Sequence, residues 1–261
     1  DAAGCRREAS DLLDAIDESL IRSRNIRGTQ AIPASPDRRM DAGAVGSLVA
    51  SYPLGLVAPD DPRLIGTAEW LAENCLVKGA FFQDMIHSGM NPYLTLHLAQ
   101  VFLRASRSEY WSLVQAVADL ASPTGQWPEA VHPRTGGGCM GDGQHGWAAA
   151  DWTLMMRSLF VREEGSRLIL GSGIPCQWIE SGRAMCFGPT PTRFGDVTVR
   201  IQPAGSEATV TWDAPWREPP ERVDVMLPAF APATVSASDQ RTVTVDQDSR
   251  SKSDGEGGPC S

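Results

Sequence analysis

The sequence predicts an α+β protein in which a domain of helical hairpins is followed by an antiparallel β-sandwich. Apolar residues recur at helical spacing up to about residue 162, so we expect residues 7–162 to be almost wholly helical. After Gly165 they alternate with polar residues, as in Val197, Val199 and Ile201. The resulting domains are helical hairpins over residues 1–164, a sandwich over 165–246 and a disordered tail over 247–261, which lacks apolar residues apart from Cys260.

Composition restricts the partners that the chain can have. The 261 residues are 42% apolar, enough for a substantial core, and carry a net charge of -9. An acidic protein is poorly suited to nucleic acid or to an anionic membrane, so we expect neither as a partner. Neither a signal peptide nor a membrane-spanning apolar run is present, which favours a cytoplasmic location, although a segment upstream of Asp1 is conceivable.

The six cysteines are widely scattered, which favours reduced and mostly buried thiols. A pair between Cys176 and Cys186 across a hairpin is the alternative.

Six helices are expected before Glu163, each placed by local signals. Asp41, Asp61-Pro62, Asn91-Pro92 and Ser108 are helix-start signals, because these side chains accept hydrogen bonds from the first free backbone N–H groups. The helices cover approximately residues 7–24, 42–52, 62–77, 92–105, 109–121 and 146–162. The first should be amphipathic, with Leu13, Ile16 and Leu20 along one face.

The connections between these helices alternate between short and long. The long polar ones cover residues 25–40, 78–90 and 122–143, and the stretch from 80 to 89 is expected to be irregular or briefly extended. Antiparallel hairpins would bring the long loops to one shared end. We therefore expect a functional site at that end.

The segment from Trp127 to Trp147 is the richest in chemistry. It holds two carboxylates, two imidazoles, a guanidinium and two indoles among six glycines, which let a backbone approach a ligand closely. Indoles stack on the C–H faces of sugars, and polar side chains bind the hydroxyls. The substrate-binding candidates are Asp41, Trp127, His132, Arg134, Asp142, Gln144, His145 and Trp147. The two aspartates are equally explained as helix caps, and the two indoles as core residues.

Neither a metal nor a cofactor is expected. The four histidines lack the spacing of zinc ligands. Gly136, Gly138 and Gly141 spell G-x-G-x-x-G, but no strand precedes them as a dinucleotide site requires. A G-x-S-x-G elbow for a serine hydrolase is also missing.

The order of these motifs resembles the six-hairpin, (α/α)6-barrel glycoside hydrolases of the glucoamylase and α-rhamnosidase kind. The matching residues are Met40-Asp41-Ala42, Asp60-Asp61-Pro62-Arg63 with Gly66-Thr67, and Trp127-Pro128-Glu129 through Trp147. The resemblance implies part of an α/α toroid with an accessory sandwich, and it implies that Glu129 is the catalytic general base. The family barrel has twelve helices, so the six seen here correspond to its carboxy-terminal half. A missing amino-terminal half, or self-association in its place, is expected, and the family's general acid has no counterpart in this sequence.

The resemblance therefore implies an oligosaccharide or glycoside as substrate. The chain would be an inverting glycoside hydrolase, or part of one, that uses general acid/base catalysis without a cofactor. One alternative is a carbohydrate-binding or structural module without catalysis, because a general acid is not seen. The other is a glycoside phosphorylase or lyase on the same barrel. A phosphorylase would need an anion pocket, for which His132, Arg134 and the amides of residues 136–138 are the candidates.

Overall fold

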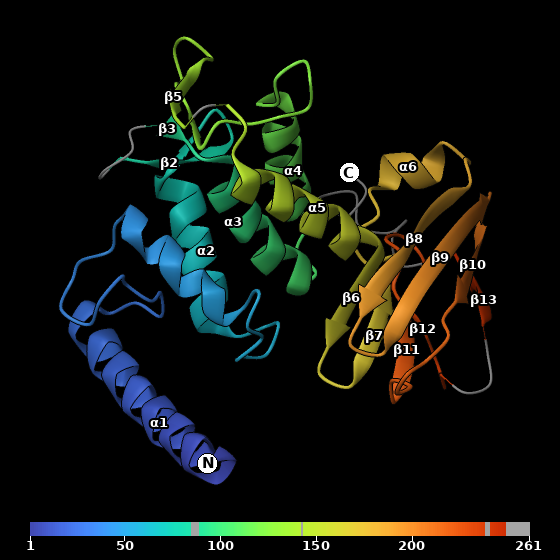
Figure 1. The fold of residues 1–261 in the computed structure, drawn as a ribbon, viewed down its shortest axis with the longest axis horizontal. Helices are drawn as coiled ribbons and strands as arrows, with labels where there is room; N and C mark the ends of the chain where they lie inside the picture. Colours follow the sequence, from blue (N-terminus) through green and yellow to red (C-terminus); the bar gives the residue numbers. More distant parts are fainter. Residues whose placement is uncertain (85–88, 142, 238–240, 249–261) are drawn as a thin grey trace. The chain divides into compact units, whose positions relative to one another are not determined.

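A computed structural model describes residues 1–84, 89–141, 143–237 and 241–248 (Figure 1). The chain forms two compact units. The first contains residues 1–105 and 112–149, and the second contains residues 106–111 and 150–261. The prediction of an α+β chain with helices and antiparallel sheets is confirmed at that level.

All six predicted helical segments are present. They are α1 (Ala2–Arg27), η1 (Ala42–Ala50), α2 (Pro62–Asn74), α3 (Pro92–Arg104), α4 (Glu109–Asp119) and α5 (Gly146–Phe160), of which η1 is a 3-10 helix. The caps act as expected, since the Asp41 carboxylate accepts from the Gly43 N–H at 2.8 Å and Asp61 accepts from the Arg63 N–H at 2.8 Å. Asn91 differs, because its side chain makes no capping hydrogen bond and instead donates to the Gly89 carbonyl at 3.0 Å.

Helix α1 keeps most of its apolar residues in contact with solvent. Ser23 is its only buried residue, whereas Leu12, Leu13 and Ile16 are all exposed. It is joined to α2 by an ion pair of 2.7 Å between Asp17 and Arg63. Its apolar face is the kind of surface that a partner covers, and the predicted self-association or missing barrel half stays a prediction.

The expectation that residues 7–162 are almost wholly helical is wrong. A five-stranded antiparallel sheet has the order β1 (Leu76–Val77), β2 (Ala80–Gln83), β3 (Gly89–Met90), β4 (Ala130–Val131) and β5 (Gly138–Met140). Its strands are two to four residues long, too short to give a period-two pattern. Ala80, Met90 and Val131 form its buried core. The sheet therefore joins the 78–90 loop to the Trp127–Trp147 segment.

Helix α3 is the centre of the first unit. Every residue of α3 except His97 is buried, in contact with α2, η1 and β2. Inside this core the Thr95 hydroxyl accepts from the Phe81 N–H at 2.9 Å, and so fixes β2 against the start of the helix. The half-exposed side of α3 at His97 is consequently held by a rigid element.

The second unit contains two four-stranded sheets. One has the order β13 (Thr242–Asp246), β10 (Glu207–Asp213), β9 (Gly195–Ala204), β8 (Met185–Thr192), and the other has the order β12 (Ala233–Val235), β11 (Arg222–Val225), β7 (Arg167–Leu170), β6 (Val161–Glu164). The predicted inward residues of β9, Val197, Val199 and Ile201, are buried. All pairs are antiparallel except β7 with β11, which is parallel and was not predicted. Packing of the two sheets as a sandwich stays a prediction.

The packing boundary differs from the predicted domain boundary. It falls inside α5 between Ala149 and Ala150, and the second unit also takes residues 106–111. Hydrophobic periodicity changes near Gly165 because the helix ends and strands begin there, not because packing changes there. Strand β6 directly follows α5 and carries a buried ion pair of 2.7 Å between Arg162 and Glu164, called the β6 ion pair below.

The carboxy-terminal segment corrects two further expectations. The tail was predicted to be disordered from Gln247, but the Gln247 N–H donates to the Ser206 carbonyl at 2.8 Å and the Asp248 N–H donates to Ala229 at 2.9 Å. Residues 249–261 lie outside the described part. Cys176, in the short helix α6 (Cys176–Glu180), is disulfide-bonded, which contradicts the expectation of reduced thiols. Cys5, Cys75, Cys139 and Cys186 do not form disulfides, so Cys176 does not pair with Cys186, and none of these four side chains is buried, contrary to the expectation of mostly buried thiols.

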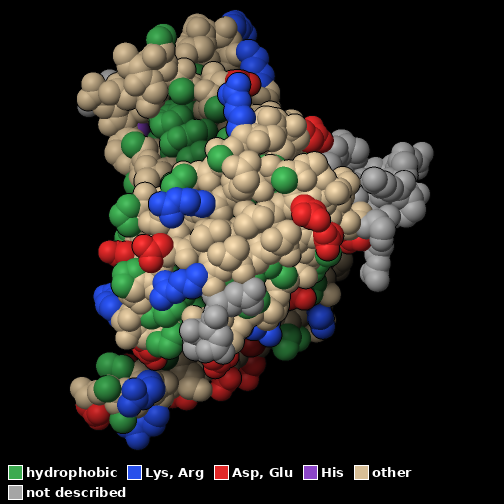
Figure 2. Space-filling model, turned by 90° about the vertical axis from the view of Figure 1, so that its right-hand side faces the viewer, with side chains coloured by type: hydrophobic (Ala, Val, Ile, Leu, Met, Phe, Trp, Pro, Cys, Tyr) green, Lys and Arg blue, Asp and Glu red, His purple; other side chains and the backbone are tan. Residues whose placement is uncertain are grey.

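The surface mixes the two signs of charge. On the coloured part of the face drawn in Figure 2, Lys and Arg side chains lie among Asp and Glu side chains without merging into one basic area. Within the described ranges, each helix is too short or too polar to cross a membrane.

Candidate functional site

The Trp127–Trp147 segment is closed on itself by main-chain hydrogen bonds. The His145 N–H donates to the Trp127 carbonyl at 2.8 Å, and the Glu129 N–H donates to the Met140 carbonyl at 3.1 Å. Further out, the His132 N–H donates to Gly137 at 2.8 Å. These bonds make the segment a hairpin that brings Glu129 and His145, sixteen positions apart, to the same end.

Two glycines of this segment, Gly138 and Gly141, serve its own packing. A Cβ on Gly138 would lie 3.0 Å from the Pro128 side chain, and one on Gly141 would lie 3.3 Å from the Glu129 nitrogen. Gly141 also has a φ of +74°, which side chains other than glycine rarely adopt. Close approach to a ligand was the predicted role of these glycines. Their observed contacts are with the backbone and side chains around Glu129.

Four rings form an aromatic cluster, which consists of Tyr93, His97, His145 and Trp147. Tyr93 is central and buried, with its ring centroid 4.8 Å from that of Trp147 and 5.1 Å from that of His145. His97 lies 6.2 Å from Tyr93 and 6.3 Å from Trp147. Trp147 is 55% exposed, so Tyr93 supports one side of an indole whose remainder faces solvent.

Local structure explains the position of each ring. Tyr93 and His97 are four residues apart near the start of α3 and therefore share one face of that helix. His145 immediately precedes α5, where its Nδ1 accepts from the Ala148 N–H at 3.4 Å, and Trp147 lies in the first turn. Two helix starts thus supply the cluster, and the closed hairpin holds Glu129 on the same segment as two of its rings.

Several candidates have mainly structural surroundings. The Trp127 ring is only 5% exposed, and its indole N–H donates to the Val117 carbonyl at 2.8 Å, which is the environment of a core residue. Asp41 caps η1 and also pairs with Arg38 at 2.5 Å. The His132 Nδ1 accepts at 3.2 Å from the N–H groups of Arg134 and Thr135, so it shapes a turn.

The remaining candidates lie on the surface of the hairpin. Arg134 and Gln144 are exposed, and Glu129 is half-buried. Asp142 lies outside the described residues. The sequence interpretation did not include Tyr93 among the candidates, and it considered His97 only as one of the four histidines that lack the spacing of zinc ligands. The signal for both was their spacing of four residues directly after Asn91-Pro92, which places them on one helical face at the loop end.

Cys75, directly after α2, has a raised thiol pKa. Burial raises the pKa of the Cys75 thiol to about 11, and the nearby charges of Asp84 and Asp41 contribute in the same direction. Cys75 is therefore a protonated and unreactive thiol at neutral pH. Among the described residues, no group of three or more His, Cys, Asp and Glu side chains is arranged so that it could bind a metal ion.

Comparison with known proteins gives one kind of match. No family model matches the chain, and no curated protein matches it. Among solved structures, a wild-type glycosidase and a glycosidase variant in complex with glucose each match with a TM-score of 0.46 and 19% identity, over 58% of this chain. A further glycosidase variant matches with a TM-score of 0.44 and 18% identity. The chain spans 44% of the length of these structures.

Proposed function

We propose that the first unit carries a carbohydrate site of an inverting glycoside hydrolase, or of part of one. The observation that carries the proposal is the exposed Trp147 indole, which Tyr93 holds on the same hairpin as the Glu129 carboxylate. An aromatic surface beside a carboxylate supplies the two things that glycoside hydrolysis needs from a protein at one subsite. These are a platform for the sugar ring and a base for the water.

The aromatic cluster is suited to a neutral sugar. The outer side of Trp147 accepts the apolar C–H face of a pyranose, and the packing of its inner side against Tyr93 fixes the ring before the ligand binds. His145, His97 and Gln144 surround this platform with groups that can donate to or accept from hydroxyls. The platform sets the plane of the sugar, and the polar groups set its rotation in that plane.

Glu129 acts in this proposal as the general base. It removes a proton from a water molecule, whose oxygen attacks the anomeric carbon on the face opposite the leaving group. The glycosidic C–O bond breaks, and a second carboxyl group about 6.5–9.5 Å away protonates the departing oxygen. The general acid is not assigned to a residue of this chain.

A module that binds carbohydrate without cleaving it is the second candidate. The observation in its favour is that the platform is built within the first unit, from rings at the starts of α3 and α5. The phosphorylase alternative loses its anion cradle. The Gly136 N–H already donates to the His132 carbonyl at 2.9 Å, and the Gly137 N–H donates to the Thr135 hydroxyl at 3.3 Å.

The test combines binding and turnover on neutral oligosaccharides and on aryl glucosides and rhamnosides, the substrate classes of the resembling family. Glu129→Gln should lower kcat by about 10² to 10⁴-fold and leave affinity nearly unchanged, because it keeps the shape of the side chain and removes its basicity. Glu73→Gln, at an exposed position of α2, is the matched control and should change neither. Azide should restore turnover of Glu129→Ala and give a glycosyl azide of inverted configuration.

The outcomes separate the two candidates. Binding that Trp147→Ala abolishes, with no cleavage by the wild type, would establish the binding module. Full turnover by Glu129→Gln would remove Glu129 as the base. A failure of every sugar to bind would reject both functions.

A further inference from the structure

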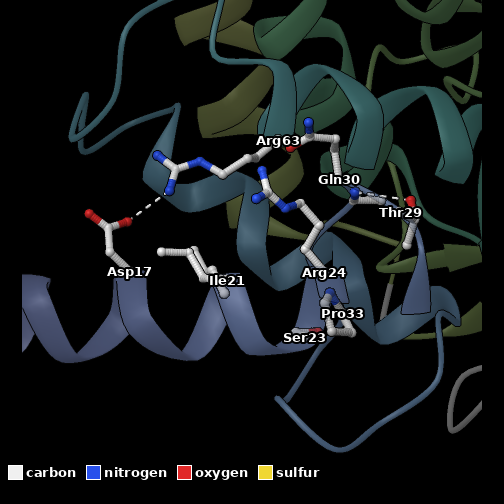
Figure 3. A pocket seen from close by; sticks show the side chains of 10 residues that line it. Asp17, Ile21, Ser23, Arg24, Thr29, Gln30, Pro33 and Arg63 are labelled. Atoms are coloured by element: carbon white, nitrogen blue, oxygen red, sulfur yellow. Dashed lines mark hydrogen bonds and ion pairs between the residues drawn. The ribbon is translucent and has the colours of Figure 1, made fainter. Parts of the chain in front are cut away.

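A pocket of about 270 Å³ lies between α1 and the loop that follows it, in the first unit and apart from the aromatic cluster. Figure 3 shows it lined on one side by successive turns of α1 and on the other by Thr29, Gln30 and, from α2, Arg63. Its volume is just below the range of about 300–1,000 Å³ that is usual for small-molecule sites. A molecule of monosaccharide size or smaller would fit.

The walls of this pocket are fixed by contacts that do not depend on a ligand. Asp17 on α1 pairs with Arg63 at 2.7 Å, which links the helix to α2 across the pocket. The Ile32 N–H donates to the Thr67 hydroxyl at 2.7 Å, and the Ala31 N–H donates to the Thr29 hydroxyl at 3.2 Å. The loop is therefore attached to α2, and the cavity is preformed.

Most polar groups of the lining are already engaged. Arg63 pairs with both Asp17 and Asp61, and the Ser23 hydroxyl accepts from Arg27 at 3.2 Å. Arg24 and Gln30 are different. Their side chains form no hydrogen bond or ion pair with another residue in the described part of the chain. Figure 3 shows Arg24 extending from α1 toward Arg63, with Gln30 entering from the opposite wall.

One guanidinium of the lining is not paired with a carboxylate. Asp17 and Asp61 both pair with Arg63, whereas Arg24 pairs with no carboxylate among the described residues. A guanidinium matches a carboxylate with two parallel hydrogen bonds, and the Gln30 amide can donate a third. Leu20, Ile21 and Pro33 supply an apolar wall beside these donors.

We propose that this pocket binds a small organic monocarboxylate through Arg24 and Gln30, with its apolar body against Leu20, Ile21 and Pro33. A monoanion pairs with Arg24 alone, whereas the second negative charge of a phosphate dianion would have no free guanidinium to pair with. The proposal is independent of the carbohydrate function, because it uses none of the aromatic cluster or the hairpin. It adds a second ligand site to the first unit.

The test is a ligand-observed NMR titration of the complete protein in a buffer low in chloride. Pentanoate is the probe, and pentanamide is its neutral counterpart of the same shape. Pentanoate should bind at least about tenfold more tightly than pentanamide, because the charge-assisted hydrogen bonds to Arg24 are lost with the amide. Arg24→Gln should remove that preference.

Arg22→Gln is the matched control. Arg22 is exposed on the same helix two residues away and does not line the pocket, so the variant loses the same overall charge and should keep the preference. Both variants should melt like the wild type, since both side chains are exposed. Equal binding of pentanoate and pentanamide, equal losses in the two variants, or no binding at millimolar concentration would overturn the proposal. Tighter binding of inorganic phosphate than of pentanoate would overturn the assignment of the ligand class.

Discussion

Replacement of Gly141 by alanine tests whether the glycine holds Glu129 in place. Gly141 has a φ of +74°, where a side chain costs about 1–2 kcal/mol, and part of that cost is offset by the stiffer unfolded chain. The new Cβ would also lie 3.3 Å from the Glu129 nitrogen and 3.4 Å from its Cβ, so Glu129 must move by a few tenths of an ångström. Such overpacking costs a further ~1 kcal/mol or more.

Gly136→Ala separates the two contributions. Gly136 has a φ of +72° in the same hairpin, but its added Cβ would have nothing within 4 Å. The two variants therefore share the backbone cost, and only Gly141→Ala adds the contact with Glu129. We expect a difference between them of about 1 kcal/mol, which corresponds to roughly a fivefold change in an equilibrium constant.

Hydrogen exchange of the Glu129 amide is the appropriate assay. This N–H donates to the Met140 carbonyl at 3.1 Å, so its exchange reports the opening of the hairpin at the catalytic candidate. It should exchange about five times faster in Gly141→Ala than in Gly136→Ala. Equal exchange in the two variants would refute the reasoning, because the backbone cost alone would then explain both.

Three further predictions concern charges and a thiol. The Arg63 side chain, 2.8 Å from Asp61, lowers the pKa of that carboxyl below 3.8. Asp61 therefore stabilises the folded state at neutral pH, and this contribution is lost as the pH falls through the lowered pKa. The free energy of urea unfolding should accordingly differ less between pH 7 and pH 3 for Asp61→Asn than for the wild type. Glu164→Gln should lower the free energy of unfolding by about 3 kcal/mol, because it removes the carboxylate that pairs with the buried Arg162 guanidinium in the β6 ion pair. A decrease under ~1 kcal/mol in urea unfolding would contradict this. At pH 8 iodoacetamide should modify exposed Cys186 well before Cys75, whose raised pKa of about 11 keeps it protonated. Mass spectrometry of timed digests gives the order of modification, and modification of Cys75 first would contradict the prediction.

The features that the sequence predicted well are local ones. Asp61 and Pro62 are adjacent, and a cap followed by proline determines the start of a helix without help from distant residues. The same holds for Asp41 and for the alternation of Val197, Val199 and Ile201 in β9. Each of these patterns contains its own physical cause within a few positions.

The features that were missed depend on distant partners. Strand β3 has two residues and pairs with β4, about forty positions later, so it has no pattern of its own. Tyr93 was not a candidate until the fold placed it against the ring of Trp147, and the indole N–H of buried Trp127 finds its partner in the Val117 carbonyl. Trp127 and Trp147 are indistinguishable in the sequence, and only the fold places one in the core and the other on the surface.

The hydrogen-bonded hairpin divides the Trp127–Trp147 segment into parts with different tolerance to evolutionary change. Its tip, residues 132–137, is closed by the bond from His132 to Gly137, and no atom lies within 4 Å of a Cβ added at Gly136. Insertions and substitutions at the tip therefore remodel the outer rim while Glu129 and Trp147 keep their places. Residues 138–141 pack against Pro128 and Glu129 and allow no such variation. Under the proposed function, changes at the tip would alter which ligands bind without moving the candidate base.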